Sequence, residues 1–229
     1  APRDVAARMQ LARYFEPQSK WDEVVETLAP VSDILPKDGI FLMARAYAYK
    51  AQYDRELRLL DMLLQKQPKD AAVLMRIGEA YEHNKRGGDA VEAFIKAKQL
   101  APNSLIPYQA LINRLEQEKD LAAARGYAQE VIRRFPNAAA AYQSKVCRFY
   151  SEEGFLKQTI TACLEAIKRE PNNADNHVFL AKAYVDREDS KLGEVKVNDA
   201  AMRFPASYNA QATAGQISFD KKNFLLAYK

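Results

Sequence analysis

Apolar residues recur along this chain at helical spacing, in paired stripes that polar or glycine-containing turns separate. Residues 71–104 illustrate the pattern. The first stripe comprises Leu74, Ile77, Gly78 and Tyr81, at positions i, i+3, i+4 and i+7. After the turn at residues 85–88, the second stripe comprises Ala90, Phe94 and Ala97. Because apolar residues three and four apart share one face of a helix, the pattern predicts two amphipathic helices that pack against each other.

Prolines mark the period of this pattern. Six of them are separated by 32, 34, 34, 35 and 34 residues: Pro36, Pro68, Pro102, Pro136, Pro171 and Pro205. Proline cannot continue a helix, and the Asn, Asp and Ser residues that follow most of these prolines can cap the next helix. The sequence therefore predicts one repeat array over residues 1–229, with units at approximately 5–36, 37–70, 71–104, 105–139, 140–173, 174–207 and 208–229, the last of them truncated.

These units resemble the tetratricopeptide repeat (TPR), a helix–turn–helix unit of 34 residues. Unit 71–104 carries the small, aromatic and proline positions of that family: Gly78, Tyr81, Ala90, Phe94 and Pro102. The resemblance extends over essentially the whole chain. It implies an all-α fold, a right-handed superhelical solenoid of about seven antiparallel helix pairs with the last pair incomplete, whose first helices line the concave surface.

The two ends and one interior position depart from the repeat pattern. Pro30 lies inside the predicted second helix of the first unit and is expected to break its last turn. Glu56 stands where unit 37–70 should have a small residue. The last unit stops before a second helix is complete, so we expect a fragment of a longer protein, with an uncapped end through which the chain could self-associate.

Charge and hydropathy narrow the classes of partner. The 34 Lys and Arg residues against 30 Asp and Glu give a formal net charge of +4, so nucleic acid is not expected as a partner. No apolar run approaches the roughly 18 residues that span a bilayer. A mean hydropathy of −0.41 agrees with a soluble protein. The compartment stays open, with the cytoplasm and the periplasm as the two expectations.

Few residues could support catalysis or bind a metal. His83 is placed at the end of a first helix and His177 at a core-facing position. Cys147 and Cys163 occupy core positions of one unit, where buried thiols are expected and a disulfide is the alternative. The sequence contains no nucleophile–base arrangement, metal-ligand spacing or phosphate loop. We therefore expect no enzyme activity, no cofactor and no metal.

The TPR resemblance assigns several positions of each first helix to the concave groove. The candidate partner-binding residues at these positions are Met9, Arg13, Phe41, Leu42, Arg45, Met75, Arg76, Lys145, Arg148 and Lys182. Methionine and phenylalanine can anchor apolar side chains of a partner, and arginine can pair with carboxylates. We therefore expect an acidic protein segment with apolar anchors. The alternative is that the methionines and the phenylalanine only cover adjoining helices.

Three classes of function fit such an array. The favoured one is a non-catalytic scaffold or adaptor that binds a protein segment within a multiprotein assembly. The carboxylate clamp of chaperone-binding TPR adaptors is absent, because its positions carry Met75, Glu79, Ala110, Ala141 and Lys145. One alternative is a docking or regulatory part of a larger enzyme or of a bacterial envelope, secretion or motility machine. The other is a helical-repeat RNA-binding protein, which the small net charge disfavours.

Overall fold

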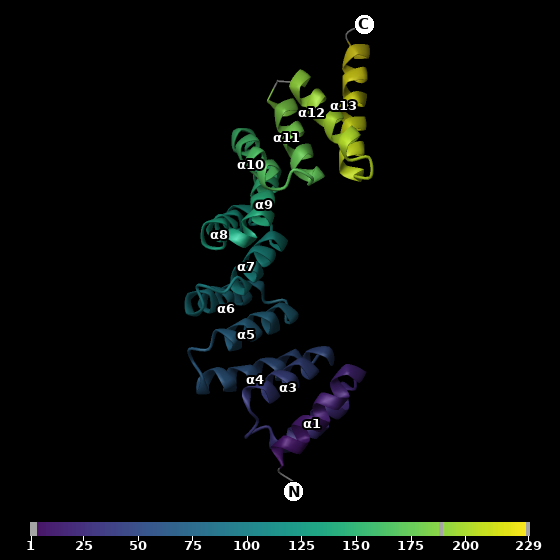
Figure 1. Ribbon diagram of the computed structural model, residues 1–229. Coiled ribbons are helices and arrows are strands. Elements are labelled where there is room, and N and C mark those ends of the chain that lie inside the picture. Colours follow the sequence, from purple (N-terminus) through teal and green to yellow (C-terminus); the bar gives the residue numbers. More distant parts are fainter. Residues whose placement is uncertain (1–3, 188–189, 228–229) are drawn as a thin grey trace. The chain divides into compact units, whose positions relative to one another are not determined.

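The computed structural model describes residues 4–187 and 190–227, and these residues are almost entirely helical (Figure 1). The described residues form thirteen α-helices, three short 3-10 turns and no strand. The helices are α1 Val5–Phe15, α2 Trp21–Leu28, α3 Lys37–Tyr49, α4 Tyr53–Lys66, α5 Ala71–His83, α6 Gly87–Leu100, α7 Ile106–Gln117, α8 Leu121–Arg134, α9 Ala139–Glu152, α10 Leu156–Arg169, α11 Ala174–Asp186, α12 Ser190–Arg203 and α13 Tyr208–Ala227. The expected all-α helical-repeat fold is confirmed.

The chain divides into two compact units. Unit 1 is Ala1–Arg114 and contains α1 to α6 with most of α7, and unit 2 is Leu115–Lys229. Within unit 1, helices pack in sequential pairs, α1 on α2, α3 on α4 and α5 on α6. Helix α2 also contacts α3, α4 contacts α5, and α3 contacts α5. Each pair thus covers the apolar face that its neighbour would otherwise expose.

Close helix packing in unit 1 depends on small residues that face aromatic ones. Gly78 of α5 lies against Phe94 of α6, whose side chain is 1% exposed. A Cβ atom built on Gly78 would lie 2.3 Å from Cε1 of that ring. Because α5 and α6 approach so closely here, this position has no room for a side chain, as the repeat pattern suggests.

Helix ends follow the predicted caps and breaks. Asp70 precedes α5, and its Oδ1 accepts hydrogen bonds from the backbone amides of Ala72 at 2.9 Å and Val73 at 3.2 Å. Helix α2 ends at Leu28, and Pro30 lies in a 3-10 turn, Ala29–Val31, that follows it. The predicted break at this proline is confirmed, because a proline lacks the amide that would continue the helix.

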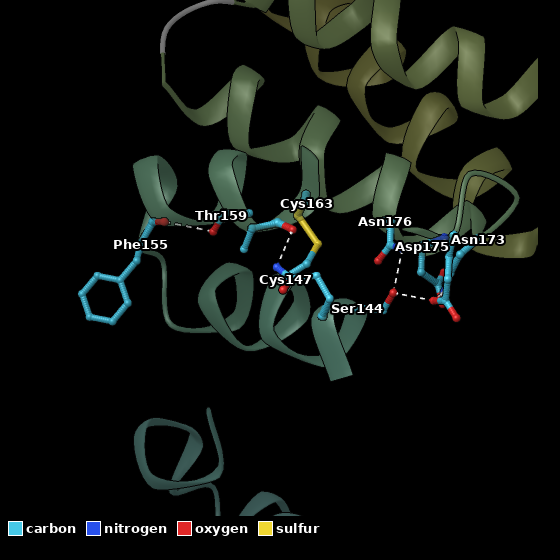
Figure 2. The surroundings of a disulfide bond; sticks show 11 residues. Ser144, Cys147, Phe155, Thr159, Cys163, Asn173, Asp175 and Asn176 are labelled. Atoms are coloured by element: carbon cyan, nitrogen blue, oxygen red, sulfur yellow. Dashed lines mark hydrogen bonds between the residues drawn. A yellow bond between two sulfur atoms is a disulfide. The ribbon is translucent and has the colours of Figure 1, made fainter. Parts of the chain in front are cut away.

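In unit 2 the expectation of free buried thiols is wrong. Cys147 of α9 and Cys163 of α10 form a disulfide, shown in Figure 2, with their Cα atoms 4.7 Å apart. Both residues are fully buried. They occupy the same two repeat positions as Gly78 and Phe94, where the helices of a pair approach most closely, and this proximity brings the sulfur atoms together.

A polar contact beside the disulfide connects successive first helices. Asn176 of α11 is 1% exposed, and its Nδ2 donates to Oγ of Ser144 in α9 at 2.8 Å (Figure 2). The Ser144 hydroxyl in turn donates to Glu170 Oε2 at 2.7 Å. Because the buried Asn176 amide and the half-buried Ser144 hydroxyl are both hydrogen-bonded, the contact holds α9 against α11 without leaving Asn176 unpaired.

The last unit contains a single long helix. Helix α13 runs without interruption over Tyr208–Ala227, whereas the sequence suggested that a second helix begins near the end of the chain. Residues 216–227 contain neither glycine nor proline, so nothing in the sequence breaks the helix there. Residues 228–229, and the side chains of 221–227 that the self-association hypothesis involves, lie outside the described part of the chain. None of the described helices is long and apolar enough to cross a lipid bilayer.

Candidate functional site

Unit 1 contains a groove of about 480 Å³ where α3, α4 and α5 meet. We name it the α3–α5 groove. Its lining residues are Phe41, Ala44, Arg45, Ala48, Tyr49, Tyr53, Glu56, Leu60, Arg76, Glu79 and His83. Ala44 and Ala48 are one turn apart on the same face of α3, and their small side chains leave the space that larger neighbours border.

The aromatic side chains of the groove are held in place by other rings. Tyr49 stacks on Trp21 of α2, with ring centroids 4.3 Å apart and planes within 3°. Tyr53 stacks on His83 of α5 at 5.6 Å. Tyr49 is nevertheless 66% exposed. A large, rigid and exposed aromatic ring offers contact area at a small cost in conformational entropy, as is typical of protein-binding sites.

A buried acidic side chain lies in the same groove. The Glu56 side chain is 6% exposed, and its Oε2 forms a hydrogen bond of 3.0 Å with Nδ1 of His83. Burial raises the pKa of the Glu56 carboxyl, and the hydrogen bond and charge of His83 oppose this rise without cancelling it. No group of three or more His, Cys, Asp or Glu side chains in the described residues is arranged to hold a metal ion.

Three of the sequence-predicted residues come together in this groove: Phe41, Arg45 and Arg76. The guanidinium of Arg76 lies 5.7 Å from the centre of the Phe41 ring and 2.7 Å from the Glu79 carboxylate. Arg45 pairs with Glu16, the residue that follows α1. Both arginines therefore already have carboxylate partners within the chain.

The other predicted residues of unit 1 contribute less to an accessible surface. Met9 and Leu42 belong to the core, with 8% and 4% of their surface exposed. Met75 is half-buried and does not line the groove. Arg13 is exposed and lies 3.9 Å from the Asp38 carboxylate. The alternative interpretation, that apolar residues of this stripe cover adjoining helices, thus describes Met9 and Leu42.

In unit 2 two of the three predicted basic residues, Lys145 and Arg148, lie around one carboxylate. Glu116 Oε1 is 2.6 Å from Arg148, and Glu116 Oε2 is 3.2 Å from Lys145. Burial alone would raise the pKa of Glu116, but the hydrogen bond from Arg148 and the two positive charges hold that pKa below its ordinary value. Lys182 is exposed and forms no ion pair with any described residue. Two of these three cations are therefore neutralised internally.

Eight groove residues were not among the predicted candidates, and the aromatic and ionisable ones of them are Tyr49, Tyr53, Glu56, Glu79 and His83. Tyr49 could have been found, because the resemblance assigns the last turn of each first helix to the concave face. Glu56 was noticed only as an unexpected charge at a small-residue position. Its contact with His83 joins residues 27 apart in different repeats, which the repeat pattern alone does not indicate.

Comparisons with solved structures agree with the fold. YrrB, described as a TPR protein with an unusual peptide-binding site, matches with a TM-score of 0.60 and 17% identity over 76% of this chain and 89% of YrrB. The C-terminal part of a TPR repeat-containing protein from Cytophaga hutchinsonii matches with a TM-score of 0.69 and 13% identity, over 86% of this chain and 79% of that one. PilF from Pseudomonas aeruginosa matches with a TM-score of 0.57 and 17% identity, over 94% and 97%.

No protein-family model matches the sequence, and no curated protein matches it either. The three solved structures are 17%, 13% and 17% identical to this chain, and structural similarity at such low identity shows a shared fold. The expected resemblance to TPR proteins is therefore confirmed as a shared helical-repeat fold.

Proposed function

We propose that the chain is a non-catalytic scaffold that binds a segment of another protein in the α3–α5 groove. The observation that supports this proposal most directly is the groove itself, with the stacked rings of Tyr49 and Tyr53, of which Tyr49 is exposed. Its volume of about 480 Å³ falls within the range of roughly 300–1,000 Å³ that is common for ligand sites. YrrB, which shares the fold, is described as having a peptide-binding site.

The lining of the groove offers apolar surface on which a partner can bind. The accessible part of this surface lies on Phe41 and Tyr49. We propose that anchor side chains of the partner occupy this apolar surface and supply most of the affinity.

The sequence also suggested that the partner is acidic, and the ion pairs weaken that suggestion. Arg45, Arg76, Lys145 and Arg148 all have carboxylate partners in the chain. An acidic segment would have to replace these partners, and each exchange gains little because one carboxylate substitutes for another. Apolar and aromatic anchors are therefore the part of the original hypothesis that the groove supports.

A matched pair of tyrosines tests the proposal. Tyr49 lines the groove and is 66% exposed, whereas Tyr14 of α1 is 65% exposed and does not line it. Proteins captured from the source organism by wild type would be compared with those captured by Tyr49→Ala and Tyr14→Ala. We expect Tyr49→Ala to lose a protein that wild type and Tyr14→Ala both retain. Equal retention by all three variants would contradict a partner site in the groove.

We further propose that the chain functions in an oxidising compartment. Disulfides persist in such compartments and are rare where thioredoxin and glutathione keep thiols reduced. Cys147 and Cys163 are bonded and fully buried, and of the two compartments that the sequence left open the bond favours the periplasm. Thiol alkylation of acid-quenched cells should find both cysteines blocked until a reductant is added. Two alkylated thiols without reductant would contradict this assignment.

A further inference from the structure

The buried carboxylate of Glu56 has far fewer hydrogen bonds than it can accept. An ionised carboxylate can accept about four. Among the described residues, only His83 forms a hydrogen bond with Glu56, and it does so through Oε2. The side chain is 6% exposed, so solvent reaches little of it. Oε1 of Glu56 forms no hydrogen bond with a described residue and is not fully enclosed, so a donor placed in the groove can reach it.

The cations nearest to this carboxylate are engaged elsewhere. Arg76 pairs with Glu79 at 2.7 Å, and Arg45 pairs with Glu16. Neither arginine forms an ion pair with Glu56 in the described chain. Among the described residues, His83 is therefore the one hydrogen-bond partner of Glu56 in the groove.

The surface around Glu56 suits a long side chain that ends in a positive charge. Ala44, Ala48 and Leu60 offer an apolar floor, and the rings of Tyr49 and Tyr53 border the same space. Lysine and arginine bury their aliphatic stems on such surfaces and keep their charged ends at a polar partner. Aromatic rings add cation–π attraction for the same groups.

We propose that the α3–α5 groove binds a lysine or arginine side chain of the partner segment, whose charged end donates hydrogen bonds to Glu56. This inference rests on the proposed function, because it names the anchor of the segment that the groove binds. Charge complementarity selects this partner: an acidic anchor would meet a buried carboxylate, whereas a basic one supplies the missing donors.

The probe is a library of random peptides displayed on phage and selected on the full-length chain. Selections on Tyr49→Ala in parallel identify peptides that depend on the groove. We expect groove-dependent peptides to share one lysine or arginine beside apolar residues. Replacing that basic residue by its neutral analogue, norleucine for lysine or citrulline for arginine, should weaken binding to wild type by at least about thirtyfold, the loss typical of one partner of a buried charge pair.

Glu56→Gln and Glu92→Gln are the matched variants. Glu56→Gln removes a buried charge and keeps the side-chain shape, so we expect the variant to fold. Glu56→Gln should reduce the affinity for the basic peptide about as much as the neutral analogue does. Combining Glu56→Gln with the neutral analogue should reduce the affinity little more than either change alone. Glu92→Gln changes an exposed carboxylate of α6 that does not line the groove and pairs with Lys96, and its effect should be less than about threefold.

The outcomes separate this inference from the proposed function. Groove-dependent peptides with an invariant basic residue and a loss of affinity in Glu56→Gln support both. Groove-dependent peptides that are acidic or purely apolar overturn the basic anchor and leave the groove as a binding site. An effect of Glu92→Gln as large as that of Glu56→Gln overturns the assignment to Glu56. Failure to select any peptide that depends on Tyr49 overturns the binding groove itself and the anchor with it.

Discussion

Replacing Gly78 by alanine should destabilise unit 1, although alanine is the better helix former. Gly78 lies inside α5, where the exchange alone would favour the helix by about 1 kcal/mol. The new Cβ would lie 2.3, 2.6 and 2.8 Å from Cε1, Cδ1 and Cζ of Phe94. Carbon atoms in good contact are about 3.5–4.0 Å apart, so the ring would have to retreat by more than an ångström.

The cost of that retreat outweighs the gain in helix propensity. Phe94 is 1% exposed and is surrounded by packed side chains, so its ring has no solvent to move into. Overpacking of this kind costs about 1–3 kcal/mol, and contacts this short belong to the upper end of that range. We therefore expect a net loss of about 2 kcal/mol in the free energy of unfolding of unit 1.

Urea unfolding followed by the fluorescence of Trp21 measures this change. Trp21 is the only tryptophan of the chain, and it lies in unit 1. Gly88→Ala is the control, because a Cβ there meets no atom within 4 Å, and it should leave stability unchanged or slightly raised. Adding Phe94→Leu to Gly78→Ala should recover more than about 0.5 kcal/mol relative to the sum of the single changes. A Gly78→Ala variant as stable as wild type would refute the reasoning.

Two further predictions concern stability under reduction and under acid. The Cys147–Cys163 bond closes a loop of 16 residues, so its reduction should lower the free energy of unfolding by about 3 kcal/mol. Urea unfolding with and without dithiothreitol measures this change. The Cys147→Ala/Cys163→Ala double variant is the control, and its unfolding should not respond to the reductant. The hydrogen bond from Lys37 holds the pKa of Asp70 below its ordinary value of 3.8, so this carboxylate stabilises the chain above that pH and the contribution is lost as the pH falls through the lowered pKa. Asp70→Asn keeps a good helix cap and removes the charge, so we expect it to cost at most about 1 kcal/mol at neutral pH and to make acid unfolding less steep. An acid-unfolding profile identical to wild type would contradict the assigned role of Asp70.

The repeat period allowed the helices to be predicted because it reflects local rules. Apolar spacing determines which residues form a helix, and prolines and caps such as Asp70 determine where it begins or ends. The break at Pro30 followed from the chemistry of a single residue. The close approach at Gly78 followed from its place opposite an aromatic position. Each of these inferences needs information from one repeat only.

The groove could be predicted only in part, because its chemistry depends on contacts between repeats. Phe41 and Arg76 were found from their positions on first helices, but their ion pairs and ring contacts were not. Arg148 was interpreted as a free cation, whereas Glu116, 32 residues earlier, neutralises it. The pairing of side chains across repeats depends on rotamers and on the angle between helix pairs, which a sequence period does not specify.

The central claim is that a partner segment binds the α3–α5 groove, and crosslinking from inside the groove tests it most directly. A photoreactive phenylalanine would replace Tyr49 in one variant and Tyr14 in another, and cells of the source organism would be irradiated. We predict that the Tyr49 variant crosslinks one protein, that fragments of the adduct map to a single segment of that protein, and that the Tyr14 variant does not form the adduct. Adducts of equal yield at both positions, or none at Tyr49, would contradict the account.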